Sequence, residues 1–229
     1  MSENKEFKTI IDSLKRYMEL ESLSGQRELP IQRGQVSISG VVSGGDLSPL
    51  ERLKSEVSSC TKCNLSKTRS QVVFGAGSPV ADLMFVGEAP GMEEDLQGIP
   101  FVGRAGALLT KIIEAISLKR ENVYIANVLK CRPPANRNPL PAEILICEGY
   151  LIKQIELIKP KVICALGKFA AQTLLRSEEP ISRLRGTFYD YHGAKLMPTF
   201  HPAYLLRNSA GKQFVWEDMK KIQRMLNSK

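Results

Sequence analysis

Residues 83–106 read LMFVGEAPGMEEDLQGIPFVGRAG, and this stretch decides the fold. It opens with a short apolar run that is typical of a buried strand. The loop that follows holds four acidic residues and Phe101, and from Arg104 onward apolar residues recur at helical spacing. A parallel α/β sheet places its ligand site in such a loop, outside the carboxyl end of a strand. We therefore expect the loop from Gly87 to Gly106 to form the floor of an active site.

Strand and helix patterns alternate along the rest of the chain. Short apolar segments rich in β-branched residues predict strands over 82–87, 122–128, 161–166 and 195–200. Helical spacing predicts helices over 104–117, 141–158, 168–176 and 212–227. This alternation is typical of a central parallel sheet with helices on both sides. Residues 183–193 are expected to add a hairpin or an edge strand before the last strand.

The first 47 residues differ from the remainder. Apolar residues at helical spacing predict one amphipathic helix over 4–23, and residues 24–47 have the Gly- and Ser-rich composition of a linker. A new helix is expected at Ser48-Pro49-Leu50-Glu51, which combines an N-cap serine, a proline at the first helical position and a glutamate three residues after the cap. We therefore divide the chain into residues 1–47 and a domain over 48–229.

Charge is concentrated in the second part of the chain. Residues 1–50 hold 6 Lys+Arg and 7 Asp+Glu, so residues 51–229 hold 26 and 17 of the totals of 32 and 24, a net charge of +9. A basic domain of this kind favours a polyanionic partner. No run approaches the roughly 20 apolar residues of a membrane span, and no signal peptide pattern is seen. We expect a soluble, cytoplasmic protein without membrane contact.

Four of the five cysteines form a metal-binding pattern: Cys60 and Cys63 have two residues between them, and Cys131 and Cys147 follow later in the chain. Such a set can bind zinc or an iron–sulfur cluster. Zinc ribbons prefer two tight pairs, so the wide second pair favours a cluster. Cys164 lies within an apolar run and is expected to be a buried hydrophobic residue. Disulfides are not expected in an intracellular chain.

Three expected strand ends bring polar side chains to one edge of the sheet: Glu88, Asn127 and His201, with Phe101 above them. These groups suit a planar heterocycle, because an Asn side chain donates and accepts in one plane and an aromatic ring stacks on a base. A histidine can stabilise charge on a carbonyl oxygen. Neither a dinucleotide fingerprint nor a Walker-type Gly-Lys-Ser/Thr is present. Lys168, at a helix start, suits either a DNA phosphate or simple helix entry.

Taken together, the motifs resemble those of family 4 uracil-DNA glycosylases, the iron–sulfur branch of that superfamily. The resemblance covers about residues 50–229. It is carried by the four-cysteine spacing and by four motifs: GEAPG-x-EED (87–95), G-x-PFVGRAG (98–106), N-x-x-KCRPP-x-NRNP (127–139) and HPAYLLR (201–207).

The resemblance implies a fold, a cofactor and a base pocket. The fold is a three-layer α/β/α domain with a central four-stranded parallel sheet, and the cofactor is a [4Fe–4S] cluster. In the pocket, the Glu88–Ala89 backbone and Phe101 hold uracil, Asn127 reads its N3–H and O4, and His201 faces its O2. The residues implied to contact the duplex are Tyr204, Leu205, Leu206 and Arg207, and those implied to bind the cluster are Cys60, Cys63, Cys131 and Cys147.

The implied activity is monofunctional: the nucleotide flips out of the helix, the glycosidic bond breaks, and water adds to the sugar. The best-known branch of the superfamily has a water-activating Asp where this chain has Ala89, and family 4 members also have a small residue there. Glu88, Glu94 or Asp95 is therefore expected to orient the water, with Glu94 slightly ahead.

The leading hypothesis is thus an enzyme that releases uracil from single- or double-stranded DNA. The alternative is a non-catalytic iron–sulfur module that binds DNA or accompanies a polymerase. We expect a monomer, with residues 1–47 available for a replication or repair partner.

Overall fold

The computed structural model of the protein describes residues 47–228. The helix expected over 4–23 and the linker expected over 24–47 lie outside this range, apart from Leu47, and stay predictions. The helix expected after Ser48 is confirmed as α2 (Pro49–Ser58). Its capping box is complete: the Glu51 N–H donates to Ser48 Oγ (3.3 Å), and the Ser48 N–H donates to Glu51 Oε2 (2.8 Å).

A single sheet organises the described residues, with strand order β1-β3-β2-β4-β6-β5. The four predicted strands are confirmed as the parallel centre of this sheet, which consists of β3, β2, β4 and β6. Two antiparallel strands flank this centre: β5, which corresponds to the expected edge strand, and β1, which was not expected and brings the number of strands in the sheet to six. The bounds are β1 Ala76–Gly77, β2 Leu83–Gly87, β3 Tyr124–Asn127, β4 Val162–Leu166, β5 Tyr189–Tyr191 and β6 Ala194–Thr199.

The edge strand expected within 183–193 is confirmed as β5, which forms a hairpin with β6. His192 and Gly193 make the turn and both have positive φ, 46° and 80°, the twist that a two-residue hairpin requires. At the other edge, β1 is only two residues long. A Cβ at Gly77 would overlap the Val123 carbonyl oxygen, so only glycine permits this close pairing with β3.

The four predicted helices are confirmed, with ends that differ by a residue or two. Helix α5 begins at Pro141 as expected from the proline preference for the first helical turn. The remaining helices are shorter and lie in loops at the sheet ends. The bounds are α3 Met92–Gln97, α4 Arg104–Ala115, α5 Pro141–Ile158, α6 Gly167–Leu175, α7 Ile181–Leu184, α8 Pro202–Leu205 and α9 Gly211–Asn227.

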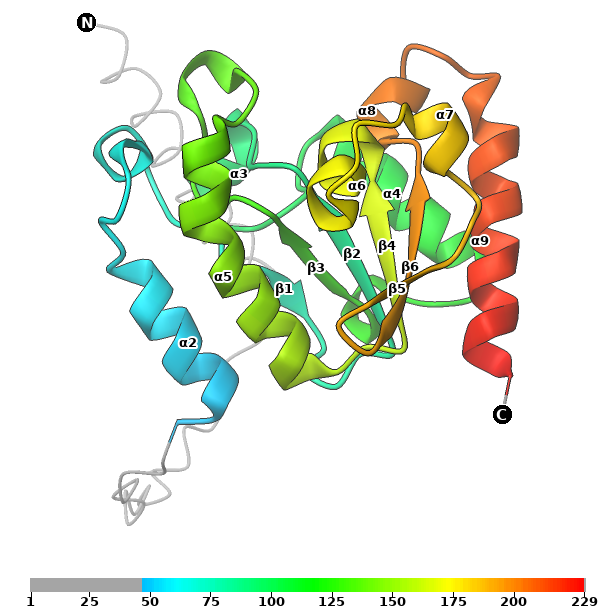
Figure 1. Ribbon diagram of the computed structural model, residues 1–229, viewed down its shortest axis with the longest axis horizontal. Coiled ribbons are helices and arrows are strands. Elements are labelled where there is room, and N and C mark those ends of the chain that lie inside the picture. Colours follow the sequence, from blue (N-terminus) through cyan, green and yellow to red (C-terminus); the bar gives the residue numbers. More distant parts are fainter. Residues whose placement is uncertain (1–46, 229) are drawn as a thin grey trace, which may run out of the picture. The chain divides into compact units, whose positions relative to one another are not determined.

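Side chains alternate along the buried strands and build two cores, one on each face of the sheet. In β2, Leu83 and Phe85 point into a core shared with α4 and α9, whereas Met84 and Val86 point into a core shared with α5 and α6. Helices therefore cover both faces, as Figure 1 shows, and the expected three-layer α/β/α arrangement is confirmed.

The order of the strands within the sheet indicates where the site lies. Strand β2 is central, β3 lies on one side of it, and β4 lies on the other. The carboxyl ends of the four parallel strands meet at one edge of the sheet, where such folds bind ligands. Helices α3 and α8, which follow β2 and β6, both lie near the upper edge of the sheet in Figure 1. Within residues 47–228, no helix combines the length and the apolar character needed to cross a membrane.

Candidate active site

A cavity of about 530 Å³ opens at this edge of the sheet. Three strand ends contribute to it, because Glu88 follows β2, Asn127 ends β3, and His201 follows β6. The structure thus brings together all the residues expected to contact uracil. The lining consists of Glu88, Ala89, Pro90, Gly91, Glu94, Phe101, Ala105, Asn127, Pro133, Asn136, Arg137, Asn138, His201, Ala203 and Arg207.

Phe101 forms one wall of the cavity and is 7% exposed. Its φ of 54° is unusual for an aromatic residue and directs the chain back toward α4. Gly106 makes this turn possible, since a Cβ there would overlap the Phe101 carbonyl oxygen. The ring lies 5.6 Å from the His201 ring, tilted by 31°. A flat face is therefore available beside the histidine.

Asn127 presents an unused hydrogen-bond acceptor to this cavity. The residue is 2% exposed, and its buried Oδ1 has no hydrogen-bond partner within residues 47–228. Buried polar atoms are nearly always paired, so such an atom indicates a missing ligand. Gly87 keeps the space in front of it open, because a Cβ at this position would overlap Asn127 Oδ1 and lie 2.8 Å from Phe101 Cζ.

His201 is held as a neutral imidazole with a defined tautomer. Its Nδ1 accepts a hydrogen bond from the Ala203 N–H (3.0 Å), so the ring proton of the neutral form is on Nε2. Burial lowers the pKa of His201 to about 4, the Glu94 carboxylate opposes this shift, and Arg207 adds to it. The ring backs onto Gly167, where a Cβ would lie 2.9 Å from His201 Cβ. His201 therefore offers an Nε2–H donor at neutral pH.

The three acidic residues expected to compete for one role occupy different environments. Among the described residues, no hydrogen bond or ion pair reaches the Glu88 carboxyl, and burial raises its pKa to about 7. Glu94 instead accepts from three backbone N–H groups: Gly91 (3.1 Å), Val102 (3.0 Å) and Gly103 (3.3 Å).

Asp95 lies away from the cavity. It is 2% exposed, and its two oxygens accept from the Ser70 N–H at 3.0 and 3.1 Å. The contacts of Glu94 and Asp95 are thus those of residues that hold a loop in place, whereas Glu88 has both oxygens free.

The four expected metal ligands lie together, away from the sheet edge. Cys60 and Cys63 follow α2, Cys131 follows β3, and Cys147 lies in α5, yet all four line one small cavity. Two N–H···S bonds reach them, from Arg69 Nη1 to Cys131 Sγ (3.1 Å) and from the Lys130 backbone to Cys147 Sγ (3.3 Å). The fifth cysteine, Cys164, is confirmed as a fully buried residue of β4.

Known proteins resemble this chain over most of its length. The family described as "Uracil DNA glycosylase superfamily" matches residues 74–221. A type-4 uracil-DNA glycosylase of Archaeoglobus fulgidus is 44% identical over 188 residues, which cover 79% of this chain and 94% of that protein. One of Thermotoga maritima is 46% identical over 178 residues, covering 76% and 93%.

This chain belongs to the type-4 uracil-DNA glycosylases.

A part of the DNA polymerase of Bacillus phage SP01 is also similar, with 30% identity over 156 residues that cover 68% of this chain and 17% of the polymerase. The two type-4 relatives are matched over 94% and 93% of their length, whereas the match covers only a small part of the polymerase.

In this type-4 family member, the residues expected to contact DNA do not all reach the surface. Tyr204 is 40% exposed and Leu206 is 49% exposed. Arg207 and Lys168 are exposed as well. Leu205 contradicts the expectation, because it is 2% exposed and packs into the core shared by α4 and α9. Leu205 ends α8 and Leu206 is its C-cap, and these two adjacent leucines face opposite sides.

Lys130 is a buried residue beside the cavity to which the sequence patterns did not point. It is 1% exposed, and its Nζ donates to the Asn127 carbonyl oxygen (2.7 Å) and to Gln154 Oε1 (2.6 Å). Gln154 in turn donates to the Phe74 carbonyl oxygen and to the Tyr124 hydroxyl. Burial lowers the pKa of Lys130 to about 8, and the nearby Cys147 and Cys131 oppose this shift. The only sequence signal is the position of Lys130, between Asn127 and Cys131.

The loop after Cys131 was also not expected to line the cavity. Pro133, Asn136, Arg137 and Asn138 all contribute to its wall. Arg137 is held by two hydrogen bonds to Glu143, at 2.9 and 2.7 Å. Because Glu143 opens α5, this ion pair fixes the loop to the helix that carries Cys147.

The adjacent leucines at the end of α8, Leu205 and its C-cap Leu206, give a direct test of the correction. Leu205→Ala is expected to reduce the free energy of unfolding by about 2–5 kcal/mol, because it leaves a cavity in the core. Leu206→Ala should change it by no more than about 0.5 kcal/mol, as for an ordinary surface substitution. Urea unfolding of both variants, followed by circular dichroism, measures the difference. Equal losses of unfolding free energy in the two variants would contradict the burial of Leu205 in the core.

Proposed function

We propose that this protein is a monofunctional uracil-DNA glycosylase that acts in base excision repair. It hydrolyses the N-glycosidic bond of a flipped deoxyuridine in single- or double-stranded DNA, which releases uracil and leaves an abasic site. The observation that carries the proposal is the unpaired, buried Oδ1 of Asn127 in a cavity walled by Phe101 and His201. Type-4 membership supports the same activity.

Recognition follows from the hydrogen-bond pattern of the base. Asn127 Oδ1 accepts the N3–H of uracil while Nδ2 donates to O4, and Phe101 stacks on the ring. Cytosine has a bare N3 and an amino group at C4, so it opposes both contacts. Discrimination of this kind is large, because a wrong base leaves buried polar groups unpaired. The Lys130 bond to the Asn127 carbonyl oxygen holds the reading residue in place.

Bond cleavage requires stabilisation of the departing base. As the C1′–N1 bond lengthens, negative charge develops on the uracil O2 and positive charge on the sugar. The neutral His201 donates its Nε2–H to O2, and no proton needs to be removed from the ring first because the pKa is about 4. A preorganised donor in a partly dry cavity is more effective than water in the same position.

The attacking water needs an acceptor on the sugar side, and we assign this role to Glu88. Its carboxyl group has no partner in the part of the chain that the structure describes, and its pKa of about 7 suits a general base at neutral pH. Glu94, the residue favoured from sequence, holds the loop through its three backbone contacts. It thereby keeps Phe101 and Glu88 at the required spacing.

A [4Fe–4S] cluster bound by Cys60, Cys63, Cys131 and Cys147 belongs to the same proposal. The donor set fits it, because four thiols line one cavity. Burial raises the pKa of Cys131, and it raises that of Cys147 to about 11. The N–H···S bonds from Arg69 and from the Lys130 backbone partly offset these shifts. In residues 47–228, no three His, Cys, Asp or Glu side chains converge enough to hold one metal ion, and a cubane binds each cysteine at a separate iron. When bound, the cluster would supply a structural cross-link.

The remaining contacts concern the duplex. Tyr204, Leu206 and Arg207 come three to six residues after His201 and are exposed, so they are placed to fill and flank the gap that the flipped nucleotide leaves. Lys168 is exposed and follows Gly167, which contacts His201. We assign it to a DNA phosphate. Residues 1–47 remain the candidate segment for a replication or repair partner.

The activity is tested with the purified, metal-loaded protein and an oligonucleotide that contains one uracil. Alkali should cleave the strand at the abasic site that the protein creates. His201→Ala should slow release by about 10²–10³-fold, as for loss of other oxyanion donors. The matched control is His192→Ala, the other histidine of the sequence, which lies exposed in the β5–β6 turn and should not change the rate. Absence of strand cleavage with wild-type protein would favour the non-catalytic module.

The pH dependence distinguishes the two acidic residues. If Glu88 is the base, the single-turnover rate rises with pH up to about 7 and then levels off, because the carboxyl group must lose its proton. Glu88→Gln should be slow and should lack this inflection, without a loss of thermal stability. Glu94→Gln should lower the melting temperature, because it weakens hydrogen bonds to three backbone N–H groups. An unchanged inflection in Glu88→Gln would move the base to another residue.

The cluster is tested by iron content and visible absorption rather than by activity. The wild-type protein should be brown and contain about four irons per chain. Cys131→Ala should lose the colour and most of the iron, whereas Cys164→Ala should keep both, because Cys164 lies within β4. Colourless, zinc-containing protein that retains uracil release would contradict the cluster assignment.

A further inference from the structure

Three aromatic rings form a continuous surface next to the cavity, and we call Phe200, Tyr204 and Phe214 the aromatic platform. The Phe200 and Tyr204 ring centroids are 5.0 Å apart with planes inclined by 32°. Phe200 and Phe214 are 6.3 Å apart in an edge-on arrangement of 67°. Tyr204 and Phe214 are 40% and 46% exposed. Two large rings are thus open to solvent beside a half-buried third ring.

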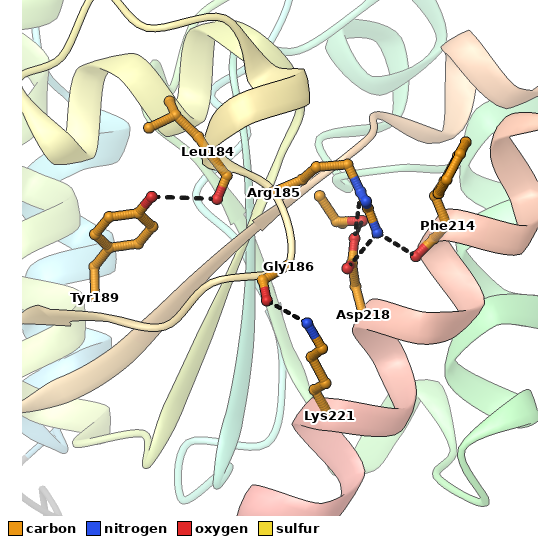
Figure 2. Close-up of polar contacts among 8 residues, drawn as sticks. Leu184, Arg185, Gly186, Tyr189, Phe214, Asp218 and Lys221 are labelled. Carbon is orange, nitrogen blue, oxygen red and sulfur yellow. Dashed lines mark hydrogen bonds and ion pairs between the residues drawn. The ribbon is translucent and has the colours of Figure 1, made fainter.

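The platform is held from behind by Arg185. Its guanidinium carbon lies 5.6 Å from the Phe200 ring centroid and 4.9 Å from that of Phe214. Figure 2 shows how the same guanidinium bonds to Asp218 and to the carbonyl oxygen of Phe214. Asp218 is fully buried and also accepts from the Thr199 hydroxyl (2.6 Å), next to Phe200 in the chain.

This support has two consequences. The Arg185 side chain is only 16% exposed and its charge is paired with Asp218, so it stabilises the rings and is not free to bind a phosphate. The rings are also fixed before any ligand arrives, which reduces the entropy that a ligand must lose to bind them. Gly211 adds to the packing, because a Cβ there would lie 3.1 Å from Tyr204 Cε1.

The platform adjoins the cavity along the chain. Phe200 directly precedes His201, and Tyr204 lies in α8 between His201 and Arg207, both of which line the cavity. Phe214 is in the first turn of α9, close to α8. The rings therefore lie close to residues that line the cavity.

We propose that the aromatic platform stacks a nucleobase of the strand that flanks the flipped nucleotide, with Phe214 as its outer ring. This inference rests on the proposed function and extends it from the cavity to the neighbouring strand. Every base has a π-face, so stacking is tolerant of sequence, as a repair enzyme requires. The net charge of +9 over residues 51–229 supplies the attraction to the backbone.

The same helix provides a matched control. Trp216 is 43% exposed, close to the 46% of Phe214, and is two residues further along α9. Its side chain faces a different neighbourhood, a groove between α4 and α9 that Leu108, Ile112 and Met219 also line. Loss of either ring removes a similar exposed aromatic surface from the same helix, but only Phe214 belongs to the platform.

The test measures binding of the metal-loaded protein to a single-stranded, fluorescently labelled oligonucleotide without uracil. Loss of one stacked base should raise the Kd of Phe214→Ala by about 5- to 150-fold. Phe214→Tyr should bind nearly as wild type, and Trp216→Ala should stay within about twofold. The slope of log Kd against log salt should be unchanged, because no phosphate contact is lost. Thermal unfolding checks that the variants fold.

Two results would overturn the proposal: Phe214→Ala binding as tightly as Trp216→Ala, or Phe214→Leu binding as tightly as wild type. The first would assign the exposed rings to another class of partner, and the second would show that apolar bulk suffices. Uracil release by the wild-type protein is assayed separately. If release fails while Phe214→Ala still weakens DNA binding, the proposed function is wrong and the platform stands. If release occurs and the binding loss is absent, only the platform is wrong.

Discussion

The buried ammonium group of Lys130 joins the parts of this protein on which its proposed chemistry depends. It lies between the cysteine cavity and the base cavity and bonds to the Asn127 carbonyl oxygen and to Gln154. A buried charge is tolerated only when its donors are satisfied and opposite charge lies near. The backbone oxygen of Asn127 meets the first demand, and thiolates at Cys131 and Cys147 would meet the second. The position of the reading residue and the state of the cysteines are thus linked physically.

A second constraint acts from the other side of the cavity. The carboxylate of Glu94 accepts hydrogen bonds from three backbone N–H groups, one at Gly91 and two at residues 102–103 of the same loop. This gathers the loop around a single charge and fixes Phe101 in its unusual φ. Glu88 has no partner among the described residues, and His201 is held neutral by burial. The Glu94 contacts thus hold the loop that carries Phe101 and Glu88. Glu94 itself supports the site, whereas Glu88 and His201 are the groups proposed to react.

The described fold follows the sequence patterns closely where those patterns are local. The strand at 162–166 and the helix at 141–158 are set by apolar periodicity within the segments themselves. Strand β1 has no such signal, because a strand of two residues is too short to show an alternation of apolar and polar residues. Leu205 and Leu206 look alike in sequence, but the first, at the end of α8, is buried, whereas the second, its C-cap, is exposed.

The sequence by itself determined the order of strands and helices, the type-4 motifs, and the residue types that surround the cavity. Only the tertiary structure decided which acidic residue is free, which tautomer His201 adopts, and that Lys130 is a structural link. The reason is that burial and pairing depend on the folded chain: Gln154, which binds Lys130, bonds to Phe74 across 80 positions, and Arg69 bonds to Cys131 across 62. The His201 tautomer has a local partner, the Ala203 N–H two residues away, but only the folded backbone brings that N–H to Nδ1. Periodicity is a local signal, whereas burial and pairing depend on which segments the fold brings together.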